Sequence, residues 1–208
     1  MSLPNHPPDP PHFSPLRSLR YAAVLLCLAS GCTSEAGPLE APSGVGSQAD
    51  ALYLLSTNTW PSPVIPVCWE NATSGNAEER GWVRDQISDT WESYSALVFD
   101  GWGSCGESSQ GIRIRISDEQ PHTKGLGTAL DGRTDGMVLD FDRAGNWRAC
   151  LFGHEKCIRA TGVHEFGHAL GFAHEQNRPD TPGSCDRDPQ GSDGDTLIGP
   201  WDGDSVMN

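Results

Sequence analysis

One short stretch, residues 164–175 with the sequence HEFGHALGFAHE, constrains this chain more than any other. In an α-helix, residues i and i+4 stack on one face, so His164 and His168 can present two imidazoles about 6 Å apart to one ion. Gly171 follows three residues after His168, where a left-handed residue can end the helix and reverse the chain. The turn then brings His174 to the same ion. Three neutral imidazoles plus water form the open, tetrahedral arrangement of a catalytic Zn2+ site with one ion.

Glu165 is the neighbour of the first histidine. Its carboxylate can contact a metal-bound water without being a ligand, so we predict that it is the general base. The alternative is a buried helix with ordinary histidines. A chance HExxH is expected in roughly one such chain in a hundred, and all five positions together in about one in twenty thousand, which favours the metal site.

The pattern HExxHxxGxxH resembles that of the metzincin zinc endopeptidases and is matched at every position, by His164, Glu165, His168, Gly171 and His174. Glu175, directly after the third histidine, is similar to the residue that marks the astacin-like branch. The run HEQNRPD at 174–180 is also similar to the astacin pattern. Outside that run the sequence is only partly similar to the astacins, so we expect its closer relatives in a bacterial branch that has no fixed place in the family.

The resemblance implies an α+β fold, with a twisted mixed β-sheet and two long helices, the second of which carries the motif. The closing residues 204–208, DSVMN, resemble the Met-turn of the family, which makes Met207 the apolar floor below the three imidazoles. The chain stops at Asn208. We therefore expect the C-terminal subdomain to be largely missing, together with a Tyr that the family places two residues after the Met, and the chain as it stands to be poorly active.

Hydrophobic periodicity predicts the elements that precede the motif. Asn76, with Glu79 three residues later, has the form of a capping box before a helix. That helix carries apolar residues at helical spacing, namely Val83, Ile87, Trp91 and Tyr94. Strands are expected at Val64–Trp69, Ala96–Phe99 and Ile112–Ile116.

A hairpin is expected from Gly125–Leu130, the turn DGRTDG, and Met137–Phe141, because the two Asp-Gly pairs supply turn geometry. The resemblance implies that the strand around Leu126–Ala129 is the exposed edge of the cleft. A substrate peptide would pair with this edge as an extra strand.

The N-terminal residues 1–31 are predicted to be a Pro-rich tail and a signal peptide. Arg17 and Arg20 precede the apolar run Tyr21–Ala29, which is too short to span a bilayer and typical of a signal peptide core. The tail is either disordered or the product of a start codon placed too far upstream. Cys32 follows small residues and resembles the lipidated cysteine of a bacterial lipobox, so the chain is either anchored to the membrane through Cys32 or simply secreted.

Residues 32–51 are predicted to be a linker or a short pro-segment, and residues 52–208 the catalytic domain, C-terminally incomplete. Astacin-like enzymes are made as zymogens in which a pro-segment Asp caps the zinc. Asp50 either has that role or is a solvated linker residue.

The chain carries a net charge of −14 and no basic stripe, which excludes nucleic acid as a partner. Its seven cysteines form no CxxC, so disulfides in an exported protein are the simpler interpretation. We expect Cys68 to pair with Cys105. A bridge between Cys150 and Cys157 would close a small loop at the entrance of the motif helix. Cys185 is left without a partner, which also suggests a missing tail.

Other residues with metal-binding chemistry are given lesser roles. Calcium is conceivable at Asp193 and Asp195, with a solvated acidic loop as the alternative. His154 and Glu155 imitate the start of the motif, but residue 158 is Ile, so we expect no ligand there. His122 is expected on the surface.

These features predict a monomeric, secreted or envelope-anchored zinc-dependent endopeptidase that acts on proteins or peptides. Peptide bonds would be hydrolysed through a zinc-activated water, with Glu165 as general base. Two alternatives stay open. One is a catalytically impaired zinc-binding envelope lipoprotein or binding module. The other is a zinc hydrolase acting on a different substrate, such as a peptidoglycan peptide.

Overall fold

The computed structural model describes residues 51–142, 153–185 and 189–208, and these fold as an α+β protein, as predicted. The predictions for Cys32, Asp50 and Cys150 lie outside the described residues. In chain order, the strands are β1 (Leu52–Leu54), β2 (Val64–Trp69), β3 (Val98–Ser104), β4 (Ile112–Ile116), β5 (His122–Thr123), β6 (Met137–Leu139), β7 (Phe172–Ala173) and β8 (Thr196–Ile198). The α-helices are α1 (Ala77–Ile87) and α2 (His154–Leu170).

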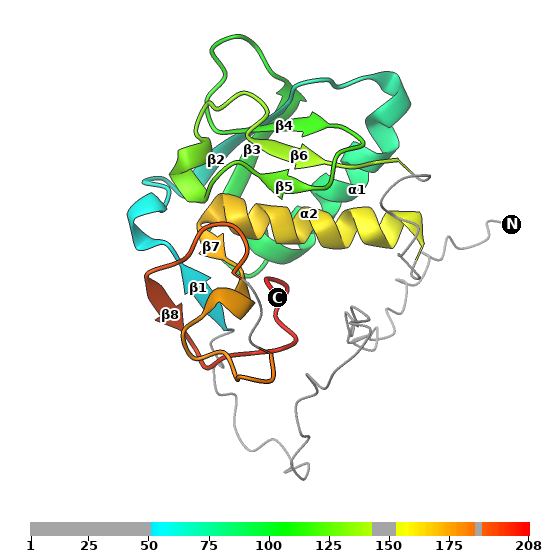
Figure 1. The fold of residues 1–208 in the computed structure, drawn as a ribbon. Helices are drawn as coiled ribbons and strands as arrows, with labels where there is room; N and C mark the ends of the chain where they lie inside the picture. The colour runs from blue at the N-terminus through cyan, green and yellow to red at the C-terminus, as the bar shows by residue number, and fades with distance from the viewer. Residues whose placement is uncertain (1–50, 143–152, 186–188) are drawn as a thin grey trace, which may run out of the picture.

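The large sheet has the strand order β3-β2-β4-β6-β5. Its strands pair in parallel except at β5, which is antiparallel to β6 and forms one edge. Helices α1 and α2 pack against each other on one side of this sheet (Figure 1). Parallel strands joined by crossovers need such a helical cover, because their apolar faces must be buried.

The main core lies between the large sheet and the two helices. β2 contributes Ile65, Val67 and Trp69, which alternate along the strand and therefore share one face. On α2, Phe166 is fully buried, and its ring lies 5.0 Å from that of Phe99 and 5.5 Å from that of Trp102. Burial of these large side chains fixes α2 against the sheet, because apolar burial is the dominant favourable term in folding.

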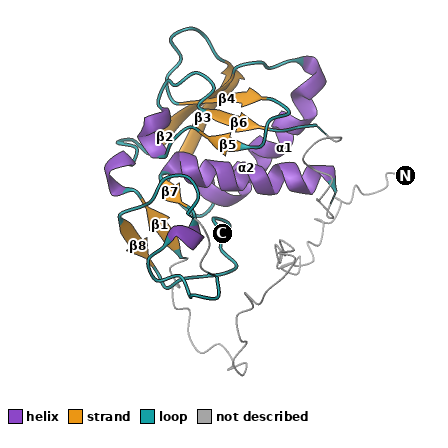
Figure 2. Cartoon of the chain, in the orientation of Figure 1, coloured by secondary structure: helices purple, strands orange, loops and turns teal. Residues whose placement is uncertain are grey.

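The small sheet has the order β7-β1-β8 and lies on the other side of α2 (Figure 2). Its central strand pairs antiparallel with both neighbours, so that Tyr53 faces Ala173 in β7 and Leu197 in β8. Tyr53 and Ala173 also form a second apolar cluster, together with Leu126. The small sheet thus ties the segment just after α2 to the start of the domain.

The helix before β3 begins differently from the prediction. The capping box is formed by Thr73 and Asn76, whose side chain accepts a hydrogen bond from the Thr73 N–H at 2.9 Å, and not by Asn76 and Glu79. Asn76 therefore ends a 3₁₀ turn, and α1 follows it. The predicted apolar stripe is also interrupted, since Tyr94 lies beyond a π-helical turn at Ser88–Glu92 and is 89% exposed.

The predicted hairpin is wrong, and so is the predicted cleft strand at Leu126–Ala129. Gly127–Leu130 is a 3₁₀ helix, and Gly127 has φ = 55°, a left-handed conformation that a strand does not accommodate. A side chain at Gly127 would overlap the carbonyl of Asn58. β6 instead pairs in parallel with β4, and the antiparallel edge strand is β5.

Strands β2 and β4 have the predicted bounds, whereas β3 starts at Val98 rather than Ala96 and continues to Ser104. A register shift against β2 at Val67 and Cys68 accommodates Gly101 and Trp102, both with positive φ. Within the described ranges, no helix combines the length and apolar character that crossing a membrane requires.

Cys68 and Cys105 form the expected disulfide, which joins the end of β2 to the loop after β3. Cys157 is also disulfide-bonded. Cys185 is disulfide-bonded as well, so the prediction that it is left without a partner is wrong.

Candidate metal centre

Helix α2 carries the first two histidines of the motif and ends where the sequence predicts. Gly171 caps it in the left-handed conformation, with φ = 106°, and its N–H donates to the carbonyl of His168 at 3.0 Å. The chain then reverses into β7, and His174 follows that strand directly. The local sequence therefore produces the turn that returns a third imidazole to the helix.

The structure brings His164, His168 and His174 together. Each offers one ligand nitrogen, and these nitrogens lie within 4.8 Å of one another. The ring centroids of His164 and His168 are 4.7 Å apart, and those of His168 and His174 are 4.5 Å apart. Within the described residues, this is the one group of three or more His, Cys, Asp or Glu side chains close enough to share an ion.

A backbone carbonyl orients each imidazole through its Nδ1. His164 Nδ1 donates to the Val206 carbonyl at 2.7 Å, and His168 Nδ1 donates to the Phe172 carbonyl at 2.7 Å. His174 Nδ1 donates to the Gln190 carbonyl at 3.0 Å. Because a carbonyl can only accept, Nδ1 carries the proton in all three rings, and Nε2 is the nitrogen left to bind a metal.

The donor set fits zinc. Burial, and next the neighbouring His164, lower the pKa of His168 to about 3, and burial also lowers the pKa of His164. These rings are therefore neutral at pH 7. The Nε2 atoms of His168 and His174 face each other at 3.2 Å, where two lone pairs repel unless a cation lies between them. Nitrogens at zinc-binding distance in a tetrahedron are about 3.3 Å apart.

Glu165 is 4% exposed, and its Oε2 has no hydrogen-bond partner among the described residues. Burial raises the pKa of this carboxyl group to about 8. A buried carboxylate oxygen without a partner is costly. Glu165 directly follows His164 on α2.

Met207 lies under α2, as the predicted Met-turn requires. It is fully buried, and a side chain at Gly167 would overlap its sulfur. The Met207 carbonyl accepts a hydrogen bond from the N–H of Glu175 at 2.7 Å. The turn therefore contacts the segment after His174 through Glu175, and it orients His164 because the preceding residue, Val206, supplies the acceptor for that ring.

Glu175 is fully buried and forms an ion pair with Arg178, with Nε and Oε1 3.3 Å apart. Arg178 also forms two hydrogen bonds of 2.8 Å to the carboxylate of Asp180. Its other contacts are with backbone carbonyls, those of Leu52, Ile198 and Gly199. A single guanidinium thus joins the segment after His174 to both β1 and β8.

The remaining candidates lie away from the triad or have other partners. His154 starts α2, and its Nε2 lies 3.0 Å from the carbonyl of Phe141. His122 lies in β5 and is half-buried rather than fully on the surface. The Asp195 carboxylate accepts hydrogen bonds from the N–H and hydroxyl of Ser56, and Asp193 accepts one from Asn177. Calcium at this loop stays a prediction.

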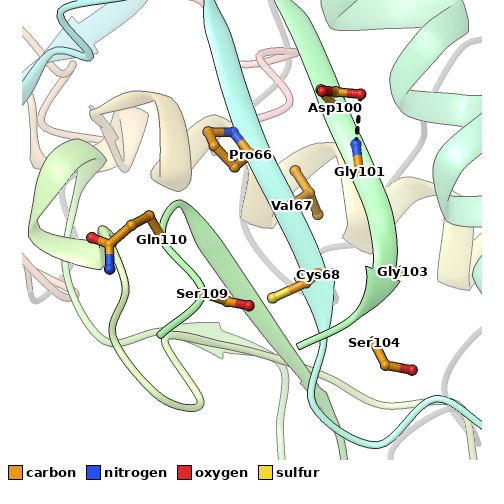
Figure 3. A pocket seen from close by; sticks show the side chains of 9 residues that line it. All are labelled: Pro66, Val67, Cys68, Asp100, Gly101, Gly103, Ser104, Ser109 and Gln110. Atoms are coloured by element: carbon orange, nitrogen blue, oxygen red, sulfur yellow. Dashed lines mark hydrogen bonds between the residues drawn. The ribbon is translucent and has the colours of Figure 1, made fainter. Parts of the chain in front are cut away.

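A separate cavity of about 360 Å³ lies on β2 and β3. Figure 3 shows Pro66 and Cys68 on one wall and Ser109 and Gln110 on the loop that faces them. The Asp100 carboxylate near its rim accepts a hydrogen bond from the next N–H, that of Gly101, at 2.8 Å. None of the three histidines lines this cavity, so it is distinct from the metal centre.

Comparison with known proteins finds a family that the motif region resembles. Residues 133–186 match the family model for astacin, a family of peptidases, and this range contains all three histidines and Glu165. This part of the chain is similar to astacin. Protein SpAN of Strongylocentrotus purpuratus is 29% identical to this chain over 128 residues, which cover 61% of the chain and 18% of SpAN.

Two solved structures are also similar to this chain. Myroilysin is 24% identical with a TM-score of 0.48, and the match covers 64% of this chain and 59% of myroilysin. High choriolytic enzyme 1, a hatching enzyme zinc-protease from Oryzias latipes, is 21% identical with a TM-score of 0.40, and the match covers 60% of this chain and 54% of that enzyme. The chain thus spans about a fifth of SpAN and somewhat over half of the solved structures.

Two parts of the candidate metal centre were not predicted. Arg178 lies in the run HEQNRPD that indicated the family, but its contacts with β1 and β8 have no sequence signal. The three carbonyl acceptors are backbone groups, which every residue carries, so no residue type marks them. The spacing of Glu175 and Arg178, three residues apart, could have suggested the ion pair between them.

Proposed function

We propose that this chain is a zinc-dependent endopeptidase that hydrolyses peptide bonds with Glu165 as general base. The observation that carries the proposal is the orientation of the three imidazoles. Each Nδ1 is bound to a carbonyl, so that the three Nε2 atoms are left to bind a metal. Glu165, with its unpartnered carboxylate oxygen, directly follows His164 in α2. Zinc bound there supplies a Lewis acid that activates water and polarises the scissile carbonyl.

In the proposed reaction, His164, His168 and His174 would hold the metal through their unprotonated Nε2 atoms. Glu165 takes a proton from the attacking water as the new C–O bond forms. It then gives that proton to the amine nitrogen as the C–N bond breaks. The raised pKa of Glu165 is consistent with both steps, because a carboxyl group near neutrality can accept and release a proton at working pH.

Strand β5 is the edge at which we expect the substrate to bind. It ends the large sheet and lies next to α2 (Figure 1). An extended peptide can pair with a free strand edge through backbone hydrogen bonds. This geometry supports the proposal of protein or peptide substrates, with β5 taking the place of the predicted strand at Leu126–Ala129.

We also propose that the chain is exported. The disulfide between Cys68 and Cys105 supports export, because disulfides persist in oxidising compartments. The signal-peptide pattern before Cys32 adds to this support. Lipidation at Cys32 would attach the chain to the envelope, and a Cys32→Ser variant recovered wholly from the medium, with the wild type in the membrane fraction, would support anchoring.

The test of the proposed reaction is Glu165→Gln. We expect casein cleavage to fall by about 10²–10⁴-fold, with zinc content unchanged, because the proton acceptor is lost and the ligands remain. Glu155→Gln is the matched control, since Glu155 lies on the same helix in an exposed ion pair with Arg159. Cleavage by Glu165→Gln at the wild-type rate would refute the assignment.

The ligand set is tested separately by His168→Ala, with His122→Ala as control. We expect the first variant to lose zinc, measured by atomic emission after dialysis, and the second to retain it. Full zinc occupancy in His168→Ala would contradict the proposed ligands.

A further inference from the structure

The side chain of Asn177 holds the backbone of Gln190 at two points. Asn177 Nδ2 donates to the Gln190 carbonyl at 2.9 Å, and the Gln190 N–H donates to Asn177 Oδ1 at 3.0 Å. Nδ2 also donates to Asp193 Oδ1 at 3.1 Å. We call this arrangement the Asn177 clamp. It uses both the donor and the acceptor of the amide, so it holds both peptide groups that flank the Cα of Gln190, one through its N–H and the other through its carbonyl.

The clamped carbonyl is the one that orients His174. His174 Nδ1 donates to the Gln190 carbonyl at 3.0 Å, so that the same oxygen accepts from the ring and from Asn177. Asn177 comes three residues after His174 and sits at the end of the 3₁₀ helix Glu175–Asn177. The clamp therefore connects a residue near the third histidine to a loop more than ten residues further on.

The other two imidazoles have acceptors with different support. The Phe172 carbonyl, which orients His168, belongs to β7 and lies four residues after that histidine. The Val206 carbonyl, which orients His164, precedes Met207, a fully buried residue whose own carbonyl is bound to Glu175. Gln190, in contrast, is exposed and lies outside any helix or strand. Its carbonyl thus depends on Asn177 more than the other acceptors depend on any single side chain.

We infer that Asn177 is a positioning residue for the metal centre, which fixes the tautomer and ring orientation of His174 through the Gln190 carbonyl. The inference rests on the proposed zinc site. Partners that orient a metal ligand affect metal affinity because they keep the binding nitrogen unprotonated and correctly directed. Without the clamp, His174 Nδ1 loses its fixed acceptor, and the ring can turn or place its proton on Nε2.

Asn71 provides a matched control elsewhere in the molecule. Its Nδ2 donates to the Ile116 carbonyl at 2.8 Å, and the Ile116 N–H donates to its Oδ1 at 2.9 Å. This is the same two-bond arrangement, here on the N–H and carbonyl of the last residue of β4. Asn71→Ala removes an equivalent pair of hydrogen bonds without touching a histidine, so general loosening of the fold affects both variants alike.

The experiment compares Asn177→Ala, Asn177→Asp and Asn71→Ala in two measurements. The first is long-range ¹H–¹⁵N NMR of the histidine rings in the zinc-free protein. We expect His174 to change from the Nδ1–H tautomer to a mixture in both Asn177 variants, while His164 and His168 do not change. Asn177→Asp is nearly isosteric and keeps an acceptor for the Gln190 N–H, but it lacks the N–H that donates to the Gln190 carbonyl. It therefore tests the loss of that one hydrogen bond if the alanine variant does not fold.

The second measurement is zinc affinity by competition with a chromophoric chelator. We expect about tenfold weaker binding in the Asn177 variants and no comparable change in Asn71→Ala. Equal changes in Asn177→Ala and Asn71→Ala, or an unchanged His174 tautomer, would overturn the inference. If the wild type binds no zinc, the proposed function fails, but the zinc-free NMR measurement still decides whether Asn177 positions His174.

Discussion

The large sheet and the small sheet lie on opposite sides of α2 (Figure 1) and differ in what holds them there. Fully buried apolar side chains pack the large sheet against its helices, with Ile65 and Ile112 among them. Around the small sheet, the apolar cluster is limited to a few residues. The buried guanidinium of Arg178 and its hydrogen bonds to β1 and β8 do much of the joining instead.

The metal centre combines these two kinds of structure. Its first two histidines are on α2, which the large sheet holds in place by apolar packing. The three carbonyls that orient the imidazoles, from Val206, Phe172 and Gln190, all belong to segments that follow α2. Apolar packing against the large sheet thus determines where α2 lies, and the hydrogen bonds from the segments after α2 determine how the imidazole rings are oriented. Substitutions on the two sides should separate stability from zinc affinity.

Arg178→Ala should have the largest effect and should change both properties. Loss of the guanidinium leaves the fully buried Glu175 without its ion-pair partner. We expect the free energy of unfolding in urea to fall by about 4 kcal/mol. Zinc affinity should fall as well, because Glu175 directly follows His174.

The control for that variant is Arg115→Ala. Arg115 is 42% exposed in its ion pairs with Glu119 and Asp135, so its loss should cost less than about 1 kcal/mol. Equal stability of the two variants would contradict the role of Arg178 in joining the small sheet.

Ile112→Ala should lower stability without lowering zinc affinity. Ile112 is fully buried in β4, and its truncation is expected to cost about 3 kcal/mol in urea unfolding. Zinc affinity of the folded protein should stay within about twofold of the wild type, because distant sites act independently. Val64→Ala, at a position 48% exposed, is the control. If Ile112→Ala lost as much zinc affinity as Arg178→Ala, stability and zinc affinity would not be separable in this way.

Glu70 and Arg113 give the large sheet a polar element whose contribution depends on pH. Arg113 donates two hydrogen bonds to the Glu70 carboxylate, at 2.8 and 3.1 Å, and these lower the pKa of Glu70. A lowered pKa in the folded state contributes stability that is present above the ordinary value of about 4.3, and that is lost as the pH falls through the lowered value.

Glu70→Gln should therefore cost about 2 kcal/mol at pH 7 and less as the pH falls below about 4. Urea unfolding at a series of pH values measures this difference between variant and wild type. Glu119→Gln, at a side chain 52% exposed, should show no such trend. A difference that does not change with pH would mean that Glu70 and Arg113 do not interact as a charged pair.

The parts of the site that depend on local spacing could be predicted from the sequence. His164 and His168 lie on one helix at i and i+4, Gly171 ends that helix with a positive φ, and β2 and β4 have the predicted bounds. These features need only the geometry of one helix, one turn or one strand. The spacing of residues within a single segment is therefore enough to predict these features.

The parts that depend on distant pairing could not. Two Asp-Gly turns suggested a hairpin, but Gly127 packs against the carbonyl of Asn58, and β6 pairs with β4 instead. The carbonyl that orients His174 comes from Gln190, sixteen residues later, and has no side-chain signature. Tyr94 has the spacing of a core residue, yet the helix ends before it. Which segments meet is a tertiary property, and it overrides local pattern.

One glycine on each helix gives expected effects of opposite sign. A Cβ at Gly81 in α1 would meet no heavy atom within 4 Å, so Gly81→Ala should raise the free energy of unfolding by about 0.5–1 kcal/mol. A Cβ at Gly167 in α2 would overlap the sulfur of Met207, so Gly167→Ala should lower it by about 1–3 kcal/mol. Urea unfolding measures both changes.

Gly167→Ala should also weaken zinc binding, because a displaced Met207 moves the neighbouring Val206 carbonyl that orients His164. A double-mutant cycle separates this contact from the general effect of alanine in a helix. In the Met207→Ala background the overlapping sulfur is absent, so Gly167→Ala should cost less there than in the wild type. Equal costs in the two backgrounds would show that Met207 does not determine the need for glycine at this position, and that α2 and the Met207 turn are not coupled through it.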